Sequence, residues 1–342
     1  MIDKTLGRLT GTEIAVDLGT ANTRLFVRGR GVAVEAPTVV AVERSQRGNA
    51  VVATGDEAKR MLGRTPEHIT AVRPIREGVV SDYALVEELL RDCIAHVSSG
   101  RRTPRSRMVV TVPQATSDVE RRAVQDSARA VGAREVTLVS KGVAAALGAG
   151  LPIHDARGTV VVDIGAGVTE VAVLSLGGLV DATSIRVAGD ALDAAITAWV
   201  KERHNVLLGA RAAESVKLAV GCAMPRQEAA IARFTGRDLG SGIPREVALS
   251  SDDLIQPLRT ALQPVVEAIR QVMARTTPEI ASDVADLGLL LTGGSALLPG
   301  LDGWLTDQTG LTVAVAEDPT RCSCIGAGLL LAEPDSRDRL AL

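Results

Sequence analysis

The stretches DLGTANTRLFV at residues 17–27 and DIGAGVTEVAV at residues 163–173 share the frame D-x-G-x-x-x-T-x-x-x-V. Each aspartate follows an apolar run, EIAV or TVVV, and precedes a glycine-rich turn into a second apolar run. That order predicts a β-hairpin with a carboxylate near its tip in each half of the chain. A single turn of this kind is more often only a tight hairpin, but two in the same frame indicate two related domains that face one another.

The paired turns have the composition of a phosphate site. Glycines let backbone N–H groups approach phosphate oxygens, and hydroxyl and amide side chains add donors. These side chains are Thr20, Asn22, Thr23 and Thr169. Because Mg²⁺ prefers oxygen ligands, we expect Asp17 and Asp163 to hold Mg²⁺ directly or through its water molecules. A cleft between the two turns would hold a di- or triphosphate from both sides.

Two other segments fit a nucleotide. LLLTGGSALLPG at residues 289–300 predicts a buried strand and a turn in which Gly293 and Gly294 can lie against a flat base. In the helical pattern ARAAESVKL, Glu214 and Lys217 lie on one face and could both reach a ribose and its base. The same two residues could equally form a solvated salt bridge with each other, so both interpretations stay open.

Composition restricts the function further. Of 342 residues, 46% are hydrophobic and 23% charged, which is enough for more than one buried core. Aromatic residues make up 1% of the chain, and the formal net charge is −3 with no basic arm, so we expect no nucleic-acid partner. The four cysteines suit neither a disulfide framework nor a zinc site. No apolar run reaches the roughly 18 residues that span a bilayer, and we expect a cytoplasmic protein.

Strand and helix patterns alternate along most of the chain, which indicates α/β sheets covered by helices. A long helical pattern at about residues 252–275 contains Pro257 and Pro264, and we expect each proline to kink or break it. The polar tail after Glu333 is expected to fray.

Taken in order, these segments resemble the superfamily of actin, sugar kinases and heat-shock chaperone ATPases, and within it the MreB/Mbl family of bacterial actins. The resemblance runs from about residue 12 to 333 and is carried by DLGTANT, GRTPEHITAVRPIREGVVSDY, SDVERRAV, VVDIGAGVTEVAVLSLGG, IRVAGDALD and VAEDPTRCSCIGAG. It implies an α/β, actin-like ATPase fold, with two α/β domains around a nucleotide cleft, each with a smaller subdomain. The implied division is 1–32, 75–145 and 320–342 for subdomain IA, 33–74 for IB, 146–188 and 252–319 for IIA, and 189–251 for IIB. The excess of arginine over lysine is typical of a GC-rich bacterium.

The resemblance also implies a function. It implies binding of ATP with Mg²⁺, self-assembly into membrane-associated filaments, and partnership with the membrane proteins of cell-wall synthesis and cell shape. The implied nucleotide contacts are Asp17, Gly19, Thr20, Asn22 and Thr23 in the first phosphate loop, Asp163, Gly165, Gly167 and Thr169 in the second, Glu214 and Lys217 at the ribose and base, and Gly293, Gly294 and Ser295 at the adenosine turn. Arg24 falls where actin has a phosphate-contacting lysine.

One difference between this sequence and the typical family sequence concerns catalysis. The chain reads VSKGVAAALG where the family typically reads IEEPMAAAIG, so Ser140 and Lys141 replace two acids, the second of which orients the attacking water in the family. A lysine cannot accept a proton from that water, and its charge beside a triphosphate favours the bound ground state. We assign Asp163 as the catalytic residue. Lys141 occupies the second catalytic position of the family, but it is a substitution there and is expected to be non-catalytic. We therefore predict ATP binding with slow or absent hydrolysis.

A second departure concerns the membrane. The family uses an N-terminal amphipathic helix or a hydrophobic loop, whereas the equivalent loop here, RRTPRSR, has no large apolar residue. Its arginines are Arg101, Arg102, Arg105 and Arg107. The loop could bind anionic lipid headgroups at the inner face of the cell membrane. It could equally be a solvated basic loop.

Three functions remain open on the sequence. A cytoskeletal filament protein is favoured, and a nucleotide-locked scaffold of the same fold that does not polymerise fits Lys141. A small-molecule kinase is less favoured because residues 33–74 are too short for a substrate-binding insertion. The sequence does not distinguish MreB from Mbl.

Overall fold

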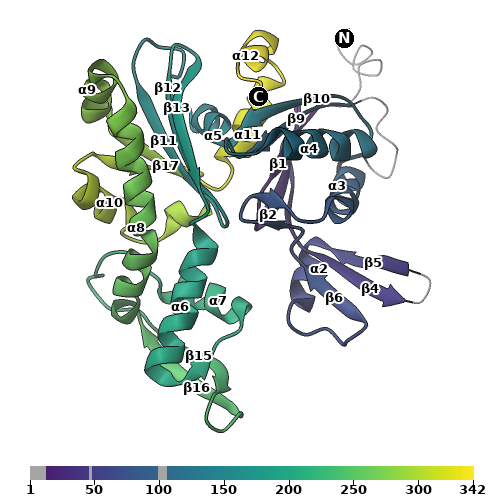
Figure 1. The fold of residues 1–342 in the computed structure, drawn as a ribbon, viewed down its shortest axis with the longest axis vertical. Coiled ribbons are helices and arrows are strands. Elements are labelled where there is room, and N and C mark those ends of the chain that lie inside the picture. The colour runs from purple at the N-terminus through teal and green to yellow at the C-terminus, as the bar shows by residue number, and fades with distance from the viewer. Residues whose placement is uncertain (1–12, 46–47, 99–105) are drawn as a thin grey trace.

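Two five-stranded sheets with the same topology form the framework of the protein (Figure 1). The structure, a computed structural model, describes residues 13–45, 48–98 and 106–342. The first sheet has the order β10 (Ala133–Ser140), β9 (Ser106–Val112), β1 (Glu13–Leu18), β2 (Asn22–Val27) and β3 (Gly31–Pro37). The second has the order β18 (Val313–Val315), β17 (Leu289–Thr292), β11 (Thr159–Ile164), β12 (Thr169–Ser175) and β13 (Gly178–Ile185).

The two hairpins predicted from the repeated frame are confirmed. β1 pairs antiparallel with β2 and parallel with β9. β11 likewise pairs antiparallel with β12 and parallel with β17. Each central strand therefore has the same two kinds of neighbour, and each aspartate lies one residue before the end of its strand.

The central strands are apolar on both faces because both faces are covered. Helices α3 (Tyr83–Ser98) and α4 (Asp118–Ala130) cover the outer face of the first sheet, and α8 (Ser251–Arg275), α9 (Pro278–Leu287) and α10 (Leu301–Thr309) lie on the outer side of the second (Figure 1). Ile14 and Val16 of β1 pack with α3 and α4, whereas Ala15 between them faces the space between the sheets. Val161 faces that space from β11. Alternate residues thus supply separate cores.

A pair of helices joins the two sheets. α5 (Lys141–Gly148) and α11 (Cys322–Leu330) lie between them (Figure 1). A Cβ atom at Gly148 would lie 1.9 Å from the carbonyl oxygen of Cys322, and one at Gly326 would lie 1.8 Å from that of Ala144. Any larger residue at these two positions would force the helices apart. The halves are therefore joined by a crossing that depends on glycine.

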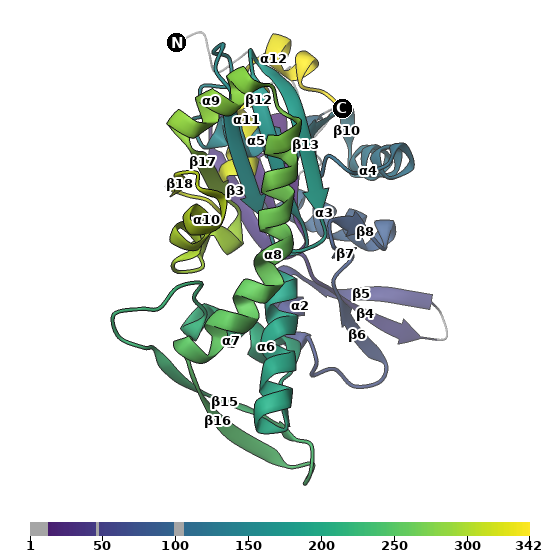
Figure 2. The same ribbon diagram turned by 60° about the vertical axis from the view of Figure 1, so that its left-hand side comes forward.

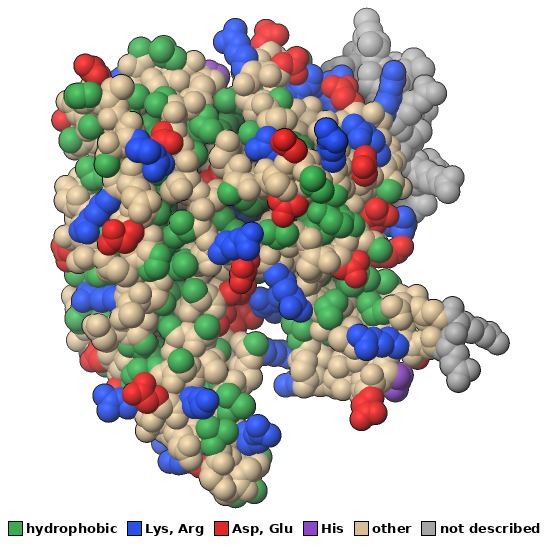
Figure 3. Space-filling view, in the orientation of Figure 1, with side chains coloured by type: hydrophobic (Ala, Val, Ile, Leu, Met, Phe, Trp, Pro, Cys, Tyr) green, Lys and Arg blue, Asp and Glu red, His purple; other side chains and the backbone are tan. Residues whose placement is uncertain are grey.

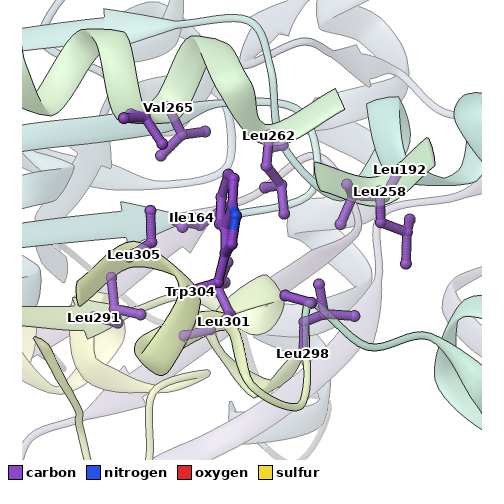
Figure 4. Close-up of a cluster of buried hydrophobic side chains, with 14 of the residues drawn as sticks. Ile164, Leu192, Leu258, Leu262, Val265, Leu291, Leu298, Leu301, Trp304 and Leu305 are labelled. Carbon is purple, nitrogen blue, oxygen red and sulfur yellow. The ribbon is translucent and has the colours of Figure 1, made fainter. Parts of the chain in front are cut away.

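The largest core lies in the second half, around Trp304 of α10 (Figure 4). Leu262 and Val265 of α8 lie on one side of the indole, and Ile164 and Leu291 lie at the ends of two strands of the sheet. Trp304 is buried in this aliphatic cluster. It therefore supports the fold and is not available to stack on a ligand.

Each half also carries a small sheet on a separate lobe, and both lobes lie at the same end of the molecule (Figure 2). The first lobe contains β4 (Val40–Ser45), β5 (Gly48–Thr54), α2 (Gly55–Met61) and β6 (Ile69–Val72), followed by the short hairpin of β7 (Ile75–Arg76) and β8 (Val79–Val80). The second contains α6 (Gly189–His204), β14 (Val206–Leu207), α7 (Ala210–Val220), β15 (Ile231–Asp238) and β16 (Pro244–Ser250). The residue boundaries of the four subdomains stay a prediction.

Helix α8 runs unbroken from Ser251 to Arg275, so the alternative that Pro257 and Pro264 break it is wrong, and a kink at either proline stays a prediction. A proline inside a helix costs about 3 kcal/mol. Against that cost, α8 buries an apolar face in the largest core, made of Leu254, Leu258, Leu262, Val265, Val266, Ile269 and Val272. Burial of one such side chain contributes roughly 1.5–3 kcal/mol, so packing outweighs both prolines.

The expectation of a frayed tail was also wrong. α12 (Pro334–Arg339) turns the chain back toward the first sheet. Beyond it, the N–H of Leu342 donates to the carbonyl of Leu138 at 3.0 Å, and Ala341 forms a β-bridge with Val139. Leu340 is buried beneath this contact. Among the described helices, none combines the length and apolar character needed to cross a membrane.

Candidate functional site

The two predicted turns have the same internal geometry. The N–H of Gly19 donates to the carbonyl of Asn22 at 3.1 Å. The N–H of Gly165 donates to the carbonyl of Val168 at 3.0 Å. The repeated frame therefore encodes a repeated turn.

The turns also meet. A Cβ atom at Gly167 of the second turn would lie 2.6 Å from Oγ1 of Thr20 in the first. The same hydroxyl accepts a hydrogen bond from the N–H of Gly78 at 3.1 Å. The prediction that the two turns face one another is confirmed, and Thr20 lies where they touch.

A threonine on the parallel neighbouring strand supports each aspartate. Thr111 of β9 is in register with Asp17, and its hydroxyl donates to Oδ1 of Asp17 at 2.8 Å. Thr292 of β17 is in register with Asp163 and donates to its Oδ1 at 3.1 Å. Both aspartates are only 2% exposed. Neither threonine was predicted from the sequence, although each ends an apolar run, MVVT or LLLT, and so belongs to the internal repeat.

Lys141 lies between the two aspartates. As the first residue of α5, it places its Nζ 3.3 Å from Oδ1 of Asp17 and 3.9 Å from Oδ2 of Asp163. Burial opposes the charge on Lys141, but the two carboxylates outweigh that effect and raise the pKa of the ammonium above its ordinary value. Burial raises the pKa of Asp163 to about 6, and Lys141 opposes this rise. The three groups form one charged cluster that links the two sheets.

The residues of this cluster do not suit the Mg²⁺ ion that the sequence predicts at Asp17 and Asp163. A divalent cation held by Asp17 and Asp163 would need carboxylate oxygens that face no other cation. Here an ammonium already faces both residues, and each also accepts a threonine hydroxyl. The two aspartates come together as predicted, but in this arrangement they neutralise a lysine.

Glu170 is a third buried carboxylate beside Asp17 and Asp163, and it was not predicted from the sequence. It is 1% exposed on β12, in register with Asp163. Four donors saturate it: Ser140 Oγ at 2.6 Å and the N–H of Gly142 at 2.6 Å reach Oε1, and the N–H of Gln114 at 2.8 Å and Ser184 Oγ at 3.3 Å reach Oε2. A carboxylate with four donors is poorly placed to take a proton from water. A charged residue within the apolar run TEVAVLS was the signal for it.

Two predicted phosphate donors are occupied in the described structure. The hydroxyl of Thr23 is buried and lies 2.9 Å from that of Thr38. The hydroxyl of Thr169 is buried and donates to the carbonyl of Val187 at 2.6 Å. These contacts hold the segments beside the turns, and phosphate contacts by Thr23 and Thr169 stay a prediction.

Arg24 lies beside the first aspartate. It is in register with Glu35 of β3, and its Nε donates to Oε1 of that residue at 2.8 Å. Its Nη1 is 3.9 Å from Oδ2 of Asp17. The guanidinium is therefore part of the charged cluster, and its contact with a phosphate stays a prediction.

The predicted adenosine segment comes together with helix α7 beside the second turn. A Cβ atom at Gly189 would lie 3.0 Å from Ser295 Oγ and 3.3 Å from Lys217 Nζ. Ser295 donates to the carbonyl of Gly165 at 2.8 Å. Gly293 lies against the second aspartate, because a Cβ atom there would be 2.9 Å from Oδ1 of Asp163. Gly294 opens the short 3₁₀ turn that follows.

Glu214 and Lys217 do not form a salt bridge with each other. Lys217 Nζ lies 2.9 Å from Oδ1 of Asp193. Glu214 reaches across to the other lobe, where its Oε1 is 3.2 Å from Nζ of Lys59. The alternative of a simple pair between them is wrong, and their contact with a ribose or base stays a prediction.

A cleft of about 830 Å³ opens between the two lobes beside Thr20 and Glu214. Besides the Lys59–Glu214 pair, Arg73 and Asp190 pair across it at 2.9 Å. Figure 3 shows basic and acidic side chains gathered where the halves meet, above the hollow between the lobes. The cleft leads from the surface to the paired turns.

The basic loop is described only at its end. Arg101, Arg102 and Arg105 lie outside the described residues. Arg107 is held by two carboxylates, with Nη1 3.1 Å from Glu13 and Nε 3.1 Å from Glu135. Glu13 and Glu135 would therefore compete with a lipid headgroup for Arg107.

Comparison with known proteins places these features in a family. The family model described as MreB/Mbl protein matches residues 11–339. The cell shape-determining protein MreB of Escherichia coli (strain K12) is 43% identical over 322 residues, which is 93% of each chain. The cell shape-determining protein Mbl of Bacillus subtilis (strain 168) is 38% identical over 328 residues, 96% of this chain and 97% of that one.

Comparison with solved structures gives the same family. MreB5 of Spiroplasma citri bound to ADP superposes with a TM-score of 0.90 at 29% identity, over 96% of this chain and 98% of that one. The MamK double helical filament shares the fold, with a TM-score of 0.77 at 23% identity over 94% and 99% of the chains. Two like sheets with facing turns thus define an actin-like protein. The chain belongs to the MreB/Mbl family.

Proposed function

We propose that this chain binds ATP in the cleft between its two halves. The observation that carries the proposal is the contact between the two glycine turns at Thr20 and Gly167, together with the position of Thr20 on the wall of the cleft. Ser295 and Lys217 lie together beside the second turn, where the adenosine would lie. The solved relative MreB5 binds ADP in one structure and AMPPNP in another.

We propose further that the chain assembles with itself into filaments that organise cell-wall synthesis and cell shape. The support is family membership and the names of the MreB and Mbl relatives, which are cell shape-determining proteins. The expected partners are further copies of this chain and membrane proteins of cell-wall synthesis. A cytoplasmic position at the inner face of the membrane, with Arg101, Arg102 and Arg105 near anionic lipid, belongs to the same proposal.

Hydrolysis is expected to be slow in this proposal. Lys141 replaces the acid that the family uses to orient water, and Glu170 nearby is saturated by four donors. A positioned general base contributes roughly 100- to 10,000-fold to such reactions, so phosphate release at least about 100-fold slower than that of an MreB with the acid is expected. Asp163 remains beside the phosphates as a charged group held by Lys141.

A second candidate is a nucleotide-locked scaffold that does not polymerise. The observation that favours it is the contact of Lys141 with an aspartate from each half, since this contact would oppose movement of the two halves apart. If the cleft kept one conformation whichever nucleotide was bound, the protein would have a single conformational state and no nucleotide-driven change that could start polymerisation.

One experiment distinguishes the candidates. The purified chain is sedimented with ATP, with ADP and without nucleotide, while bound nucleotide and released phosphate are measured in the same samples. Sedimentation that depends on nucleotide, with little phosphate released, supports the filament. A soluble monomer with bound ATP supports the scaffold, and an absence of bound nucleotide in every sample contradicts both.

A further inference from the structure

The cluster of Lys141, Asp17 and Asp163 has the charge of a cation site but contains its own cation. We propose that the Lys141 ammonium takes the place of the divalent cation in this cleft, so that the chain binds ATP without Mg²⁺. This inference rests on the proposed function, because it concerns the same nucleotide site. It goes further by naming the ionic form of the ligand, metal-free ATP.

The position of the ammonium carries the inference. Lys141 Nζ lies 3.3 Å from one carboxylate and 3.9 Å from the other, and these come from the two separate sheets. It also lies at the first turn, 3.8 Å from where a Cβ atom of Gly19 would be. An ammonium at this point faces both predicted phosphate loops. It is therefore placed where a metal ion would have to sit to be shared by Asp17 and Asp163.

The neighbouring groups already occupy most of the aspartate oxygens that a metal ion would bind. Oδ1 of each aspartate accepts a hydrogen bond from a threonine hydroxyl, and Oδ2 of Asp17 faces Nη1 of Arg24 at 3.9 Å. A divalent cation between the carboxylates would lie within a few ångströms of the ammonium, where like charges repel strongly in a poorly solvated site. Lys141 would have to leave before a metal could enter.

An ammonium can also serve the phosphates directly. Lysine carries three N–H donors and acts toward phosphate as a compact positive charge. In this proposal, the donor capacity of Lys141 that Asp17 and Asp163 leave unused serves the phosphate oxygens. Only 19% of the Lys141 side chain is exposed, so this charge is held in place and is not free to move away into water.

The inference is tested by ATP affinity with and without metal. Isothermal titration calorimetry with the purified full chain is run in buffer with Mg²⁺ and in buffer with EDTA. The dissociation constant for ATP is expected to agree within about threefold between the two buffers. Tight binding only with Mg²⁺ would overturn the inference and leave the proposed function intact, whereas no binding in either buffer would contradict the proposed function itself.

Substitutions at Lys141 sharpen the test. Lys141→Gln removes the charge and leaves two facing carboxylates, so EDTA is expected to weaken its ATP binding by at least about tenfold relative to Mg²⁺. Lys141→Arg keeps a positive charge and is expected to keep binding in EDTA. The matched control is Lys201→Gln, since Lys201 is an exposed lysine of α6 outside the cleft. A Lys141→Gln protein that binds equally well in both buffers would contradict the inference.

A direct metal readout makes the test independent of nucleotide. Mn²⁺ is titrated into the nucleotide-free chain and free Mn²⁺ is followed by electron paramagnetic resonance. The unmodified chain is expected to leave Mn²⁺ free, and the Lys141→Gln chain is expected to bind one ion per molecule. If Lys141→Gln fails to fold, as judged by circular dichroism, the unmodified chain decides alone, and tight Mn²⁺ binding by it would overturn the inference.

Discussion

At the scale of single residues, the base of the cleft shows how a buried charge is made tolerable. A carboxylate taken out of water must be paired or hydrogen-bonded, or its burial destabilises the fold. Asp17 and Asp163 meet this condition in the same way, each with a threonine in register on the parallel neighbouring strand and with Lys141 between them. The threonines are therefore supports for the site and need not touch a ligand to matter.

Replacing one of these threonines is expected to destabilise the protein. Thr292→Val removes the hydroxyl that donates to Oδ1 of Asp163 and leaves a buried carboxylate with one partner fewer. The free energy of unfolding is expected to fall by about 1–3 kcal/mol. Urea denaturation measures the change. The control is Thr260→Val, whose exposed hydroxyl donates to Gln256 within α8, and a change below about 0.5 kcal/mol is expected there.

At the scale of helices and strands, local sequence patterns predict an element correctly where the packing of the whole chain favours the same structure. The hairpins at Asp17 and Asp163 follow from apolar runs around glycine turns, and both form. The continuity of α8 and the docking of α12 were not predictable in this way, because both depend on burial against distant segments. The contacts of Lys141 were likewise hidden, since its two partners come from different sheets.

The prolines of α8 test whether burial of its apolar face outweighs the cost of proline inside a helix. Pro264 is exposed, so Pro264→Ala restores a helical N–H without changing the core. The free energy of unfolding is expected to rise by about 1–2 kcal/mol, because the helical cost of proline exceeds its restriction of the unfolded chain. The control is Pro278→Ala, where proline opens α9 and its missing N–H costs nothing, so no gain is expected. Equal gains in urea denaturation would contradict the argument.

At the scale of the whole molecule, the two halves are joined by contacts of different strength. At the base, α5 and α11 cross so closely that glycine is required at Gly148 and Gly326. At the mouth, the lobes meet through ion pairs such as Lys59–Glu214, which are partly exposed. Exposed pairs contribute about 1 kcal/mol or less. The base is therefore a fixed joint, and the mouth is the part that can open.

Reversing one charge at the mouth is expected to open the cleft. In nucleotide-free protein, Lys59→Glu replaces an attraction to Glu214 by a repulsion, and the double variant Lys59→Glu with Glu214→Lys restores the pair in reverse. The open population is expected to rise about two- to fivefold in the single variant and to return in the double one. Spin labels on cysteines introduced at the exposed positions Glu67 and Glu228 report the distance between the lobes by electron–electron double resonance.

A charge reversal away from the mouth separates this effect from a general loss of stability. Arg233 and Glu246 pair at 3.1 Å within the β15–β16 hairpin and do not bridge the halves. Arg233→Glu also creates a like-charge pair on an exposed surface, but it is expected to leave the distance between the labels unchanged. A similar widening in both single variants would show that net charge and not the Lys59–Glu214 contact sets the opening. Widening in Lys59→Glu alone, reversed in the double variant, would locate the closing force at the mouth.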